Sequence, residues 1–434
     1  MRWNSIKCVR KEKNTNILGA LIKSYLNNRK LIIEGDKWQL EEEVTCGAPQ
    51  GSKLGPFLWN IVYDGLLETK WPERTSMVGF ADDAIIISGA ENPEVLGIRV
   101  NESLFRTKMW LPKHGLEMAA NKTQAIMVTK KRAYIKPIIM IENEEIQWQR
   151  QMTYLGVEID VGLNFGPHIE KIAKKGLETC ARVARMMPNV NGPREKKRRL
   201  LAAVATSQIL YAAPAWPNAM VIDRNVRRLT STQRCAAIRV TSAYRTVSSQ
   251  AVLTLASMPP IDLLVQERAD IFERIKGSEE QSEAKKERIR KECRKETLLK
   301  WQYRWDTESS GKWTHELIPD LEKWVNRTHG ETDFYLTQAL TGHGKFNAYL
   351  HRFKKLENSE CLECGHNSED ARHTLFVCNK WDNNRRVLKT QIKSDITASN
   401  LVTLILSSEE NWNHIKTYVQ NIMKEKGKEE NKRL

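Results

Sequence analysis

Few features of this sequence suit a secreted or membrane-spanning protein. Its first 30 residues mix charged side chains with short apolar pieces, so they do not predict a signal peptide. The uncharged stretch Leu200–Ile222 is long enough to cross a bilayer, but Gln208, Asn218 and two prolines interrupt it. We interpret it as a buried helix over residues 200–211 followed by a proline-broken turn, and we expect no membrane partner.

Acidic residues are the minority charge in this chain. The 434 residues contain 53 Asp and Glu against 69 Lys and Arg, which gives a net charge of +16. This balance favours a polyanionic partner, nucleic acid rather than a membrane surface, although a basic protein can simply have solvated basic faces. Hydrophobic residues make up 41% of the chain, so we expect most of it to fold.

Cysteine is too scattered here for a secreted disulfide framework. Five of the eight cysteines are dispersed, which favours a reducing compartment, and the other three cluster with a histidine as Cys361-x2-Cys364-x8-His373-x4-Cys378. Three thiolates and one imidazole form a complete tetrahedral set for structural Zn²⁺, with no open position for catalysis. A redox pair or chance is the alternative. His366 is the competing imidazole, but it follows Cys364 by only two residues, which favours His373.

The pattern of apolar residues predicts an α+β fold. Helical spacing in residues 16–30 is followed by a hairpin turning at Gly35-Asp36, a helix within residues 55–67, a second hairpin, a helix over about 94–114, and strands within 124–129 and 137–146. This order is typical of helices packed on an antiparallel sheet. After residue 160 the pattern is helical. Residues 266–300 suggest a solvated helical face, and residues 424–434 a disordered tail.

The stretch GFADDAIIISG places two adjacent carboxylates, Asp82 and Asp83, at the turn of the second hairpin. Such an Asp pair is usually structural, because Asp side chains hydrogen-bond nearby backbone groups. Alternatively, the pair holds Mg²⁺, which prefers hard oxygen ligands and, as a two-ion site, stabilises the attacking and leaving oxygens of a phosphoryl transfer. Upstream, the glycines of GAPQGSKLGP permit a close backbone approach, or simply a turn before a helix.

Together these two stretches resemble those of a reverse transcriptase, in particular the enzymes of insect non-LTR retrotransposons that insert into ribosomal RNA genes. Further matching stretches follow in the same order: GLEMAANKTQAIMV, YLGVEID, MMPNVNGPREKKRRLL, YAAPAWPNAM and TGHGKFNAYLHRF, before the cysteine cluster. The resemblance covers nearly the whole chain. It implies a partial right-hand palm at residues 1–160, a helical thumb at 161–260, a charged helical connector at 261–340, a zinc-knuckle module at 341–390, and a C-terminal helix with a disordered tail at 391–434.

The resemblance also implies roles for individual residues. Asp82, with Asp83 beside it, would bind Mg²⁺ as a catalytic carboxylate. Lys122 would lie near the triphosphate and protonate the leaving pyrophosphate. The remaining implied positions are the template and nucleotide site at Pro49, Gln50 and Gly51 and the primer grip at Tyr154, Leu155 and Gly156.

The implied activity is extension of a DNA 3′-hydroxyl along an RNA template with deoxynucleoside triphosphates and two Mg²⁺ ions, in the nucleus after synthesis in the cytoplasm. The family's cysteine cluster is treated as a nucleic-acid-binding knuckle. Trp381 and Phe376 could stack on bases there, but a role in the small core is the preferred interpretation. Basic residues near the cluster that could contact phosphates are Lys345, Arg352, Lys354, Lys355, Lys380, Arg385 and Arg386.

A polymerase of this kind needs a third carboxylate on a strand upstream of the Gly47 loop. The first 45 residues contain one aspartate, Asp36, and it lies in a hairpin turn. We therefore expect the family's first catalytic aspartate to precede Met1, which makes catalysis by this chain doubtful. The alternatives are a non-catalytic nucleic-acid-binding remnant and a plain zinc-containing scaffold. Oligomeric state stays open.

Overall fold

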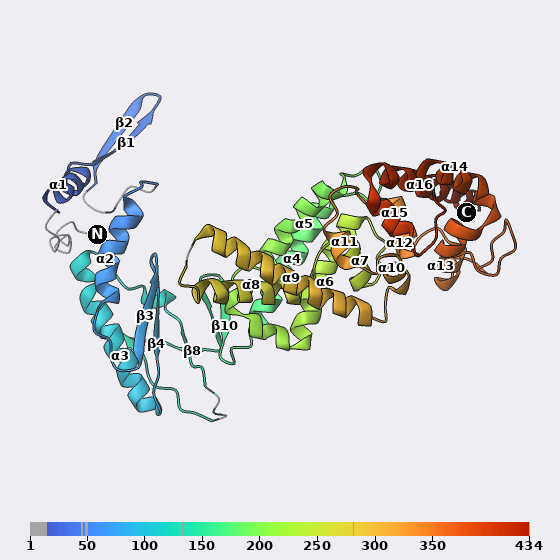
Figure 1. Cartoon of the computed structure of the whole chain (residues 1–434). Helices are drawn as coiled ribbons and strands as arrows, with labels where there is room; N and C mark the ends of the chain where they lie inside the picture. Colours follow the sequence, from blue (N-terminus) through green and yellow to red (C-terminus); the bar gives the residue numbers. More distant parts are fainter. Residues whose placement is uncertain are drawn as a thin grey trace. The chain divides into compact units, whose positions relative to one another are not determined.

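The structure is a computed structural model that describes residues 15–44, 47, 51–129, 131, 133–280 and 282–433. The chain divides into two compact units, Met1–Leu163 and Asn164–Leu434, coloured blue to green and green to red in Figure 1. The first unit mixes helices and short strands, whereas the second contains helices and, among its described residues, no strand. No described helix is both long enough and apolar enough to cross a membrane.

The first unit follows the order that the apolar pattern predicts, with its strands paired locally. Its elements are α1 (Thr15–Leu26), β1 (Lys30–Gly35), β2 (Trp38–Glu43), α2 (Gly55–Leu67), β3 (Thr75–Phe80), β4 (Asp83–Ser88), α3 (Pro93–Trp110), η2 (Pro112–His114), η3 (Ala120–Lys122), β5 (Ala125–Ile126), β6 (Met140–Ile141), β7 (Glu144–Glu145), β8 (Trp148–Gln149), β9 (Gln151–Tyr154) and β10 (Val157–Asp160).

The prediction of one antiparallel palm sheet is wrong about how the strands are connected. The described strands form five separate two-stranded sheets, of which four are antiparallel hairpins and one, β5 with β8, is parallel. Each hairpin pairs two strands close in sequence, whereas a continuous sheet needs pairing between hairpins as well. The β1–β2 hairpin turns after Gly35 as predicted, but every residue in its two strands is exposed.

Helix α2 positions the β3–β4 hairpin. It begins at Gly55, whose N–H donates to the Ser52 hydroxyl at 2.9 Å, and Pro56 suits its first turn. Its buried residues Leu58, Tyr63 and Leu66 lie on the face that points into the unit. Tyr63 and Leu66 share a hydrophobic cluster with Leu111 and with partly buried residues of β3 and α3. The hairpin is thus fixed to a helix that follows the glycine-rich loop.

The second unit contains residues 164–260 of the predicted thumb together with the predicted connector and knuckle ranges. Its elements are α4 (Gly166–Ala184), α5 (Glu195–Ile209), η4 (Ala213–Ala215), η5 (Pro217–Val221), α6 (Asp223–Thr241), α7 (Ser249–Leu255), α8 (Ile261–Lys276), α9 (Glu283–Thr307), α10 (Lys312–Leu317), α11 (Leu321–Val325), α12 (Phe334–Thr341), α13 (Asn347–Arg352), η6 (His373–Val377), η7 (Asn379–Trp381), α14 (Asp382–Ile392), α15 (Leu401–Ser407) and α16 (Glu409–Arg433). The uncharged stretch forms the second part of α5 and then the turns η4 and η5, which confirms the predicted helix and proline-containing turn. The predicted burial is wrong in part, because Leu200 and Val204 are exposed.

The prediction of a disordered tail at residues 424–434 is wrong. Helix α16 continues to Arg433, so residues predicted as a tail form its last turns. Two ion pairs hold them: the buried Lys426 bonds to Glu369, and Glu429 bonds to Lys380. In the sequence these charges look solvated, because their partners lie about 50 residues upstream.

Candidate active site and metal centre

Asp82 and Asp83 lie at the tip of the β3–β4 hairpin. Phe80 pairs with Asp83 across the strands, which leaves Ala81 and Asp82 as a two-residue turn. Ala81 adopts a φ of 53°, in the left-handed region that such tight hairpin turns require. Both carboxylates are exposed, and neither forms an ion pair with a described residue. The hairpin therefore presents two adjacent anionic oxygen groups to solvent.

Two aromatic residues of α2, Trp59 and Tyr63, hold this hairpin in place. The indole Nε1 of Trp59 donates to the Ala81 carbonyl at 2.8 Å, and the Trp59 and Tyr63 rings stack at 5.5 Å. The Tyr63 ring lies against Gly79, where a Cβ atom would overlap Cε1 of the ring. The glycine before Phe80-Ala81-Asp82-Asp83 is thus needed for a close approach between helix and hairpin.

The predicted primer-grip hairpin lies beside the two carboxylates. Strands β9 and β10 are joined by Leu155 and Gly156, whose φ values of 46° and 80° form a tight two-residue turn. Burial raises the pKa of Tyr154, and so does the negative charge of Asp83. Burial likewise raises the pKa of Tyr63, with further contributions from Tyr154, Asp82 and Asp83.

These shifts place two tyrosines and two carboxylates in one electrostatic neighbourhood. The Tyr154 hydroxyl is enclosed and has no hydrogen-bond partner among the described residues. Trp59 and Tyr63 were not among the residues singled out from sequence. The available signal was an aromatic pair four residues apart on a helix, together with a glycine in the facing strand.

The structure describes only some of the other predicted polymerase residues. Lys122 is exposed at the end of η3, and the chain just after it contacts β9, where Gln124 Oε1 accepts the Thr153 N–H at 3.4 Å. Gly51 has a φ of 85°, which suits glycine. Pro49 and Gln50 lie outside the described residues.

Cys361, Cys364, His373 and Cys378 come together in the second unit. Their ligand atoms all lie within 4.8 Å of one another, with Cys361 Sγ 3.7 Å from Cys378 Sγ and Cys364 Sγ 3.3 Å from His373 Nε2. Two sulfurs on one tetrahedral Zn²⁺, at about 2.3 Å each, would be about 3.8 Å apart. The four side chains therefore fit a zinc ion.

The backbone around this cluster explains how the side chains converge. The Cys361 carbonyl accepts the Gly365 N–H at 2.9 Å, and Gly365 has a φ of 71°, so the CxxC segment folds into a tight turn. The π-helical turn η6 brings the Cys378 N–H to the His373 carbonyl at 2.8 Å. His366 is outside the four-residue group, and its Nδ1 lies 2.9 Å from the Ser368 carbonyl.

The pKa shifts of two cluster residues are relevant to cation binding. Burial, with the neighbouring thiols, raises the pKa of Cys378 to about 12, and burial lowers the pKa of His373. Without a metal ion the Cys378 thiol is therefore neutral at pH 7, whereas a bound divalent cation would stabilise its thiolate. His373 Nδ1 is buried without a hydrogen-bond partner among the described residues, which leaves Nε2 to face the sulfurs.

Comparison with known proteins decides the nature of the first unit. Residues 3–159 match the family model of reverse transcriptases (RNA-dependent DNA polymerases). These residues are a reverse transcriptase domain. The matched range contains the Asp82-Asp83 hairpin, α2 with its two aromatic residues, and Tyr154, so the geometry described above is that of the reverse transcriptase domain.

The match to curated proteins extends beyond this domain. The chain is 29% identical over 380 residues to a retrovirus-related Pol polyprotein from a type-1 retrotransposable element of Nasonia vitripennis, covering 83% of this chain and 92% of that protein. It is 29% identical to a putative 115 kDa protein of a Drosophila melanogaster type-1 retrotransposable element and 28% identical to a Bradysia coprophila Pol polyprotein, covering 83% and 88% of this chain. The chain spans only 36% and 39% of these two proteins. No solved structure matches.

The basic residues near the cysteine cluster do not share one environment. Lys380 bonds to Glu363 at 2.9 Å and to Glu429, while Arg385 and Arg386 both bond to Asp382. The charges of these three residues are thus partly neutralised, in contrast to the phosphate contacts expected from sequence. Trp381 is buried and Phe376 packs on the same core, which agrees with their preferred role as core residues.

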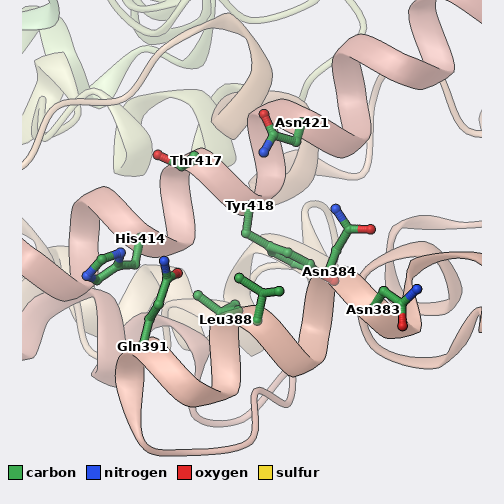
Figure 2. A pocket seen from close by; sticks show the side chains of 9 residues that line it. Asn383, Asn384, Leu388, Gln391, His414, Thr417, Tyr418 and Asn421 are labelled. Atoms are coloured by element: carbon green, nitrogen blue, oxygen red, sulfur yellow. The ribbon is translucent and has the colours of Figure 1, made fainter.

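A pocket of about 290 Å³ lies between α14 and α16, outside the reverse transcriptase domain (Figure 2). Its lining is mostly uncharged: Asn383, Asn384, Val387, Leu388, Gln391, His414, Thr417, Tyr418 and Asn421. The Tyr418 hydroxyl is not available to a ligand, because it donates to the Leu375 carbonyl at 2.6 Å. No residue of either predicted site lines this pocket.

Proposed function

We propose that the reverse transcriptase domain of this chain extends a DNA 3′-hydroxyl along an RNA template, using deoxynucleoside triphosphates. The observation that carries this proposal is the pair Asp82 and Asp83, held at a hairpin tip by Trp59 and Tyr63 beside Tyr154. The names of the relatives, Pol polyproteins of type-1 retrotransposable elements, support the same substrate class. Action in the nucleus is part of this proposal.

Each residue has a role in the proposed reaction. Asp82 and Asp83 would hold Mg²⁺, which supplies charge stabilisation for the attacking and leaving oxygens when it is bound. Lys122 donates a proton to the leaving pyrophosphate. Tyr154, Leu155 and Gly156 grip the primer end, and their tight turn lies close to Asp83. Pro49, Gln50 and Gly51 line the site of the template base and incoming nucleotide.

We further propose that Cys361, Cys364, His373 and Cys378 hold a structural Zn²⁺. The support is the fit of the four ligand atoms to a tetrahedral ion and the turn that Gly365 permits. All four positions of a tetrahedral ion would be filled by the protein, so the role of the ion is to stabilise the fold around it.

A non-catalytic nucleic-acid-binding role is the second candidate. It is favoured by the second unit, which lies outside the reverse transcriptase match and contains both the cysteine cluster and a long segment without acidic residues, 224–261. In this case the chain binds RNA or DNA with steep salt dependence, and the binding survives loss of the Asp82 carboxylate.

Primer extension on an RNA template with Mg²⁺ tests the proposed activity. We expect Asp82→Ala to reduce extension at least about 100-fold, because a lost metal ligand removes several kcal/mol of transition-state stabilisation. Asp64→Ala is the matched control, since Asp64 is an exposed carboxylate of α2 and not part of the hairpin. Equal activity of the native chain and Asp82→Ala would contradict the assignment. No extension by the native chain, together with salt-sensitive RNA binding, would establish the second candidate.

A further inference from the structure

Residue ranges 224–261 and 334–356 are two of the acid-free segments of the second unit. Residues 224–261 and 334–356 lack Asp and Glu, although the whole chain has 53 of them, and together they carry ten Arg and Lys. The first segment covers α6 after its first residue, Asp223, and α7, and the second covers α12 and α13. Long acid-free segments with several cations are typical of surfaces that contact phosphates.

Thr246 joins these two segments in space. Its hydroxyl hydrogen-bonds with Nδ1 of His343 at 2.9 Å and with the hydroxyl of Tyr349 at 2.8 Å. The rings around it form a continuous cluster, with centroids 5.9 Å apart for Tyr244 and Tyr349, 5.1 Å for His343 and Tyr349, and 4.8 Å for Tyr349 and Phe353. We call these four rings, Tyr244, His343, Tyr349 and Phe353, the aromatic platform.

The aromatic platform reaches the surface. Phe353 is 40% exposed, and Tyr244, His343 and Tyr349 are half-buried. Burial, with a smaller contribution from Arg352, lowers the pKa of His343 to about 4, so this ring is neutral at pH 7. The platform is therefore a partly exposed, uncharged stacking surface.

Four unpaired cations are adjacent or next-but-one in sequence to residues of the platform. Arg245, Arg352, Lys354 and Lys355 are exposed, and none of them forms an ion pair with a carboxylate of the described chain. The Arg352 guanidinium lies 5.8 Å from the centre of the Phe353 ring. These residues differ from Lys380, Arg385 and Arg386 near the cysteine cluster, whose charges are taken up by Glu and Asp partners.

Lys354 holds a backbone conformation that normally favours glycine. Helix α13 ends with the Lys355 N–H on the Leu350 carbonyl at 2.9 Å and the Lys354 N–H on the His351 carbonyl at 2.8 Å, and Lys354 has a φ of 56°. An L side chain in this position of a helix end costs stability that glycine would not. A cation at a helix C-terminus offsets part of this cost, so the lysine alone does not identify a ligand.

We propose that the aromatic platform and its four cations bind single-stranded nucleic acid. Unpaired bases stack on Phe353 and Tyr349, and the phosphates contact Arg245, Arg352, Lys354 and Lys355. Unpaired bases are needed because paired bases in a duplex do not expose their faces. The site uses no residue of the reverse transcriptase match and none of the four cysteine-cluster residues, although Asn347 of α13 donates to the Glu360 carbonyl next to Cys361 at 2.7 Å. It depends on the proposed function in one respect only, namely that the partner is nucleic acid.

Lys354→Gly in the full chain separates binding from folding. We expect it to weaken the affinity for a fluorescent single-stranded RNA or DNA roughly 3- to 10-fold and to reduce the salt slope by about one. The melting temperature stays equal or rises, because glycine accepts the positive φ. The matched control is Lys393→Gly, since Lys393 is also exposed, ends α14 and has a φ of 56°. Equal affinities of the two variants would overturn the proposal.

A second pair of variants tests stacking. Phe353→Ala should weaken single-strand binding about tenfold and leave binding of an equal-length duplex nearly unchanged. Phe272→Ala, which removes a 49%-exposed ring from α8, should change neither. Equal losses on single strand and duplex would overturn the stacking role. Asp82→Ala distinguishes the two proposals, because it should reduce primer extension at least about 100-fold and leave platform binding intact. If the platform variants do not weaken binding, the platform proposal fails and the primer-extension result still stands.

Discussion

Glu195 and Arg327 form a buried ion pair in the second unit, with Arg327 Nη2 2.8 Å from Glu195 Oε1. Glu195 lies in the first turn of α5, and its Oε2 accepts the Thr332 N–H and hydroxyl at 2.6 and 2.8 Å. The guanidinium of Arg327 stacks over Trp324 at 4.5 Å and lies 5.8 Å from the Trp412 ring of α16. One carboxylate therefore ties the predicted thumb to residues of the predicted connector and, through Arg327, to the C-terminal helix.

Glu195→Ala should strongly destabilise the second unit. The side chains of Glu195 and Arg327 are only 2% and 5% exposed, so the substitution leaves a buried guanidinium without its carboxylate. Breaking such a pair costs about 3–5 kcal/mol, measured as the change in free energy of unfolding in urea. Glu170→Ala, which removes the exposed carboxylate of the pair with Arg228, should cost less than about 1 kcal/mol. Similar costs for both would show that Glu195 does not couple the segments.

The same pair predicts acid sensitivity. Burial raises the pKa of Glu195, but Arg327, Arg199 and Thr332 outweigh it, so the folded-state pKa lies below the ordinary 4.5. The pair therefore contributes its full stability above pH 4.5 and loses it as the pH falls through the folded-state pKa. Urea midpoints measured between about pH 7 and about pH 3 should fall less steeply for Glu195→Gln than for the native chain. Parallel curves would contradict this prediction.

Gly79→Ala should disturb the Asp82-Asp83 hairpin. The added methyl group would overlap the Tyr63 ring, so the ring or the strand must move, at a cost of about 1–3 kcal/mol. Primer extension should fall as well, since Tyr63 and Trp59 position the turn. Gly89→Ala is the control in the same hairpin, because a Cβ there meets only the Arg74 carbonyl at 3.9 Å. A tolerated Gly79→Ala would mean that the close approach is not required.

Zinc content should follow His373 and not His366. His373→Ala should lower bound zinc, measured by elemental analysis of the purified chain. His366→Ala should retain it, because His373 and not His366 lies with the three sulfurs. Chelation should also lower the melting temperature of the second unit, since Cys361 and Cys378 share a core with Leu375 and Trp381. Zinc retained by His373→Ala and lost by His366→Ala would reverse the ligand assignment.

Much of the local structure could be predicted from the sequence. The hairpin at Gly35, the hairpin at Asp82 and the uncharged second part of α5 from residue 200 all follow from short-range signals: turn residues, alternation and helical spacing. The four-residue cysteine and histidine group was also predictable, because ligand spacing within 18 residues restricts which side chains can meet.

Contacts between distant segments were not predictable in this way. Tyr63 and Gly79 lie on different elements, and only folding shows that a ring occupies the space beside that glycine. The predicted tail was wrong for a related reason. Lys426 has the sequence pattern of a solvated charge, and its partner Glu369 is brought to it by the packing of α16.

The sequence by itself determined the family, the carboxylate pair, the metal-ligand spacing and the excess of positive charge. The tertiary structure decided which positive charges are available to a partner. Lys380 and Lys354 are the same residue type, 26 positions apart, yet Lys380 bonds to two glutamates whereas Lys354 pairs with no described carboxylate. The reason is that Coulomb interactions depend on distance in space, and those distances are set by helix packing and not by the order of residues.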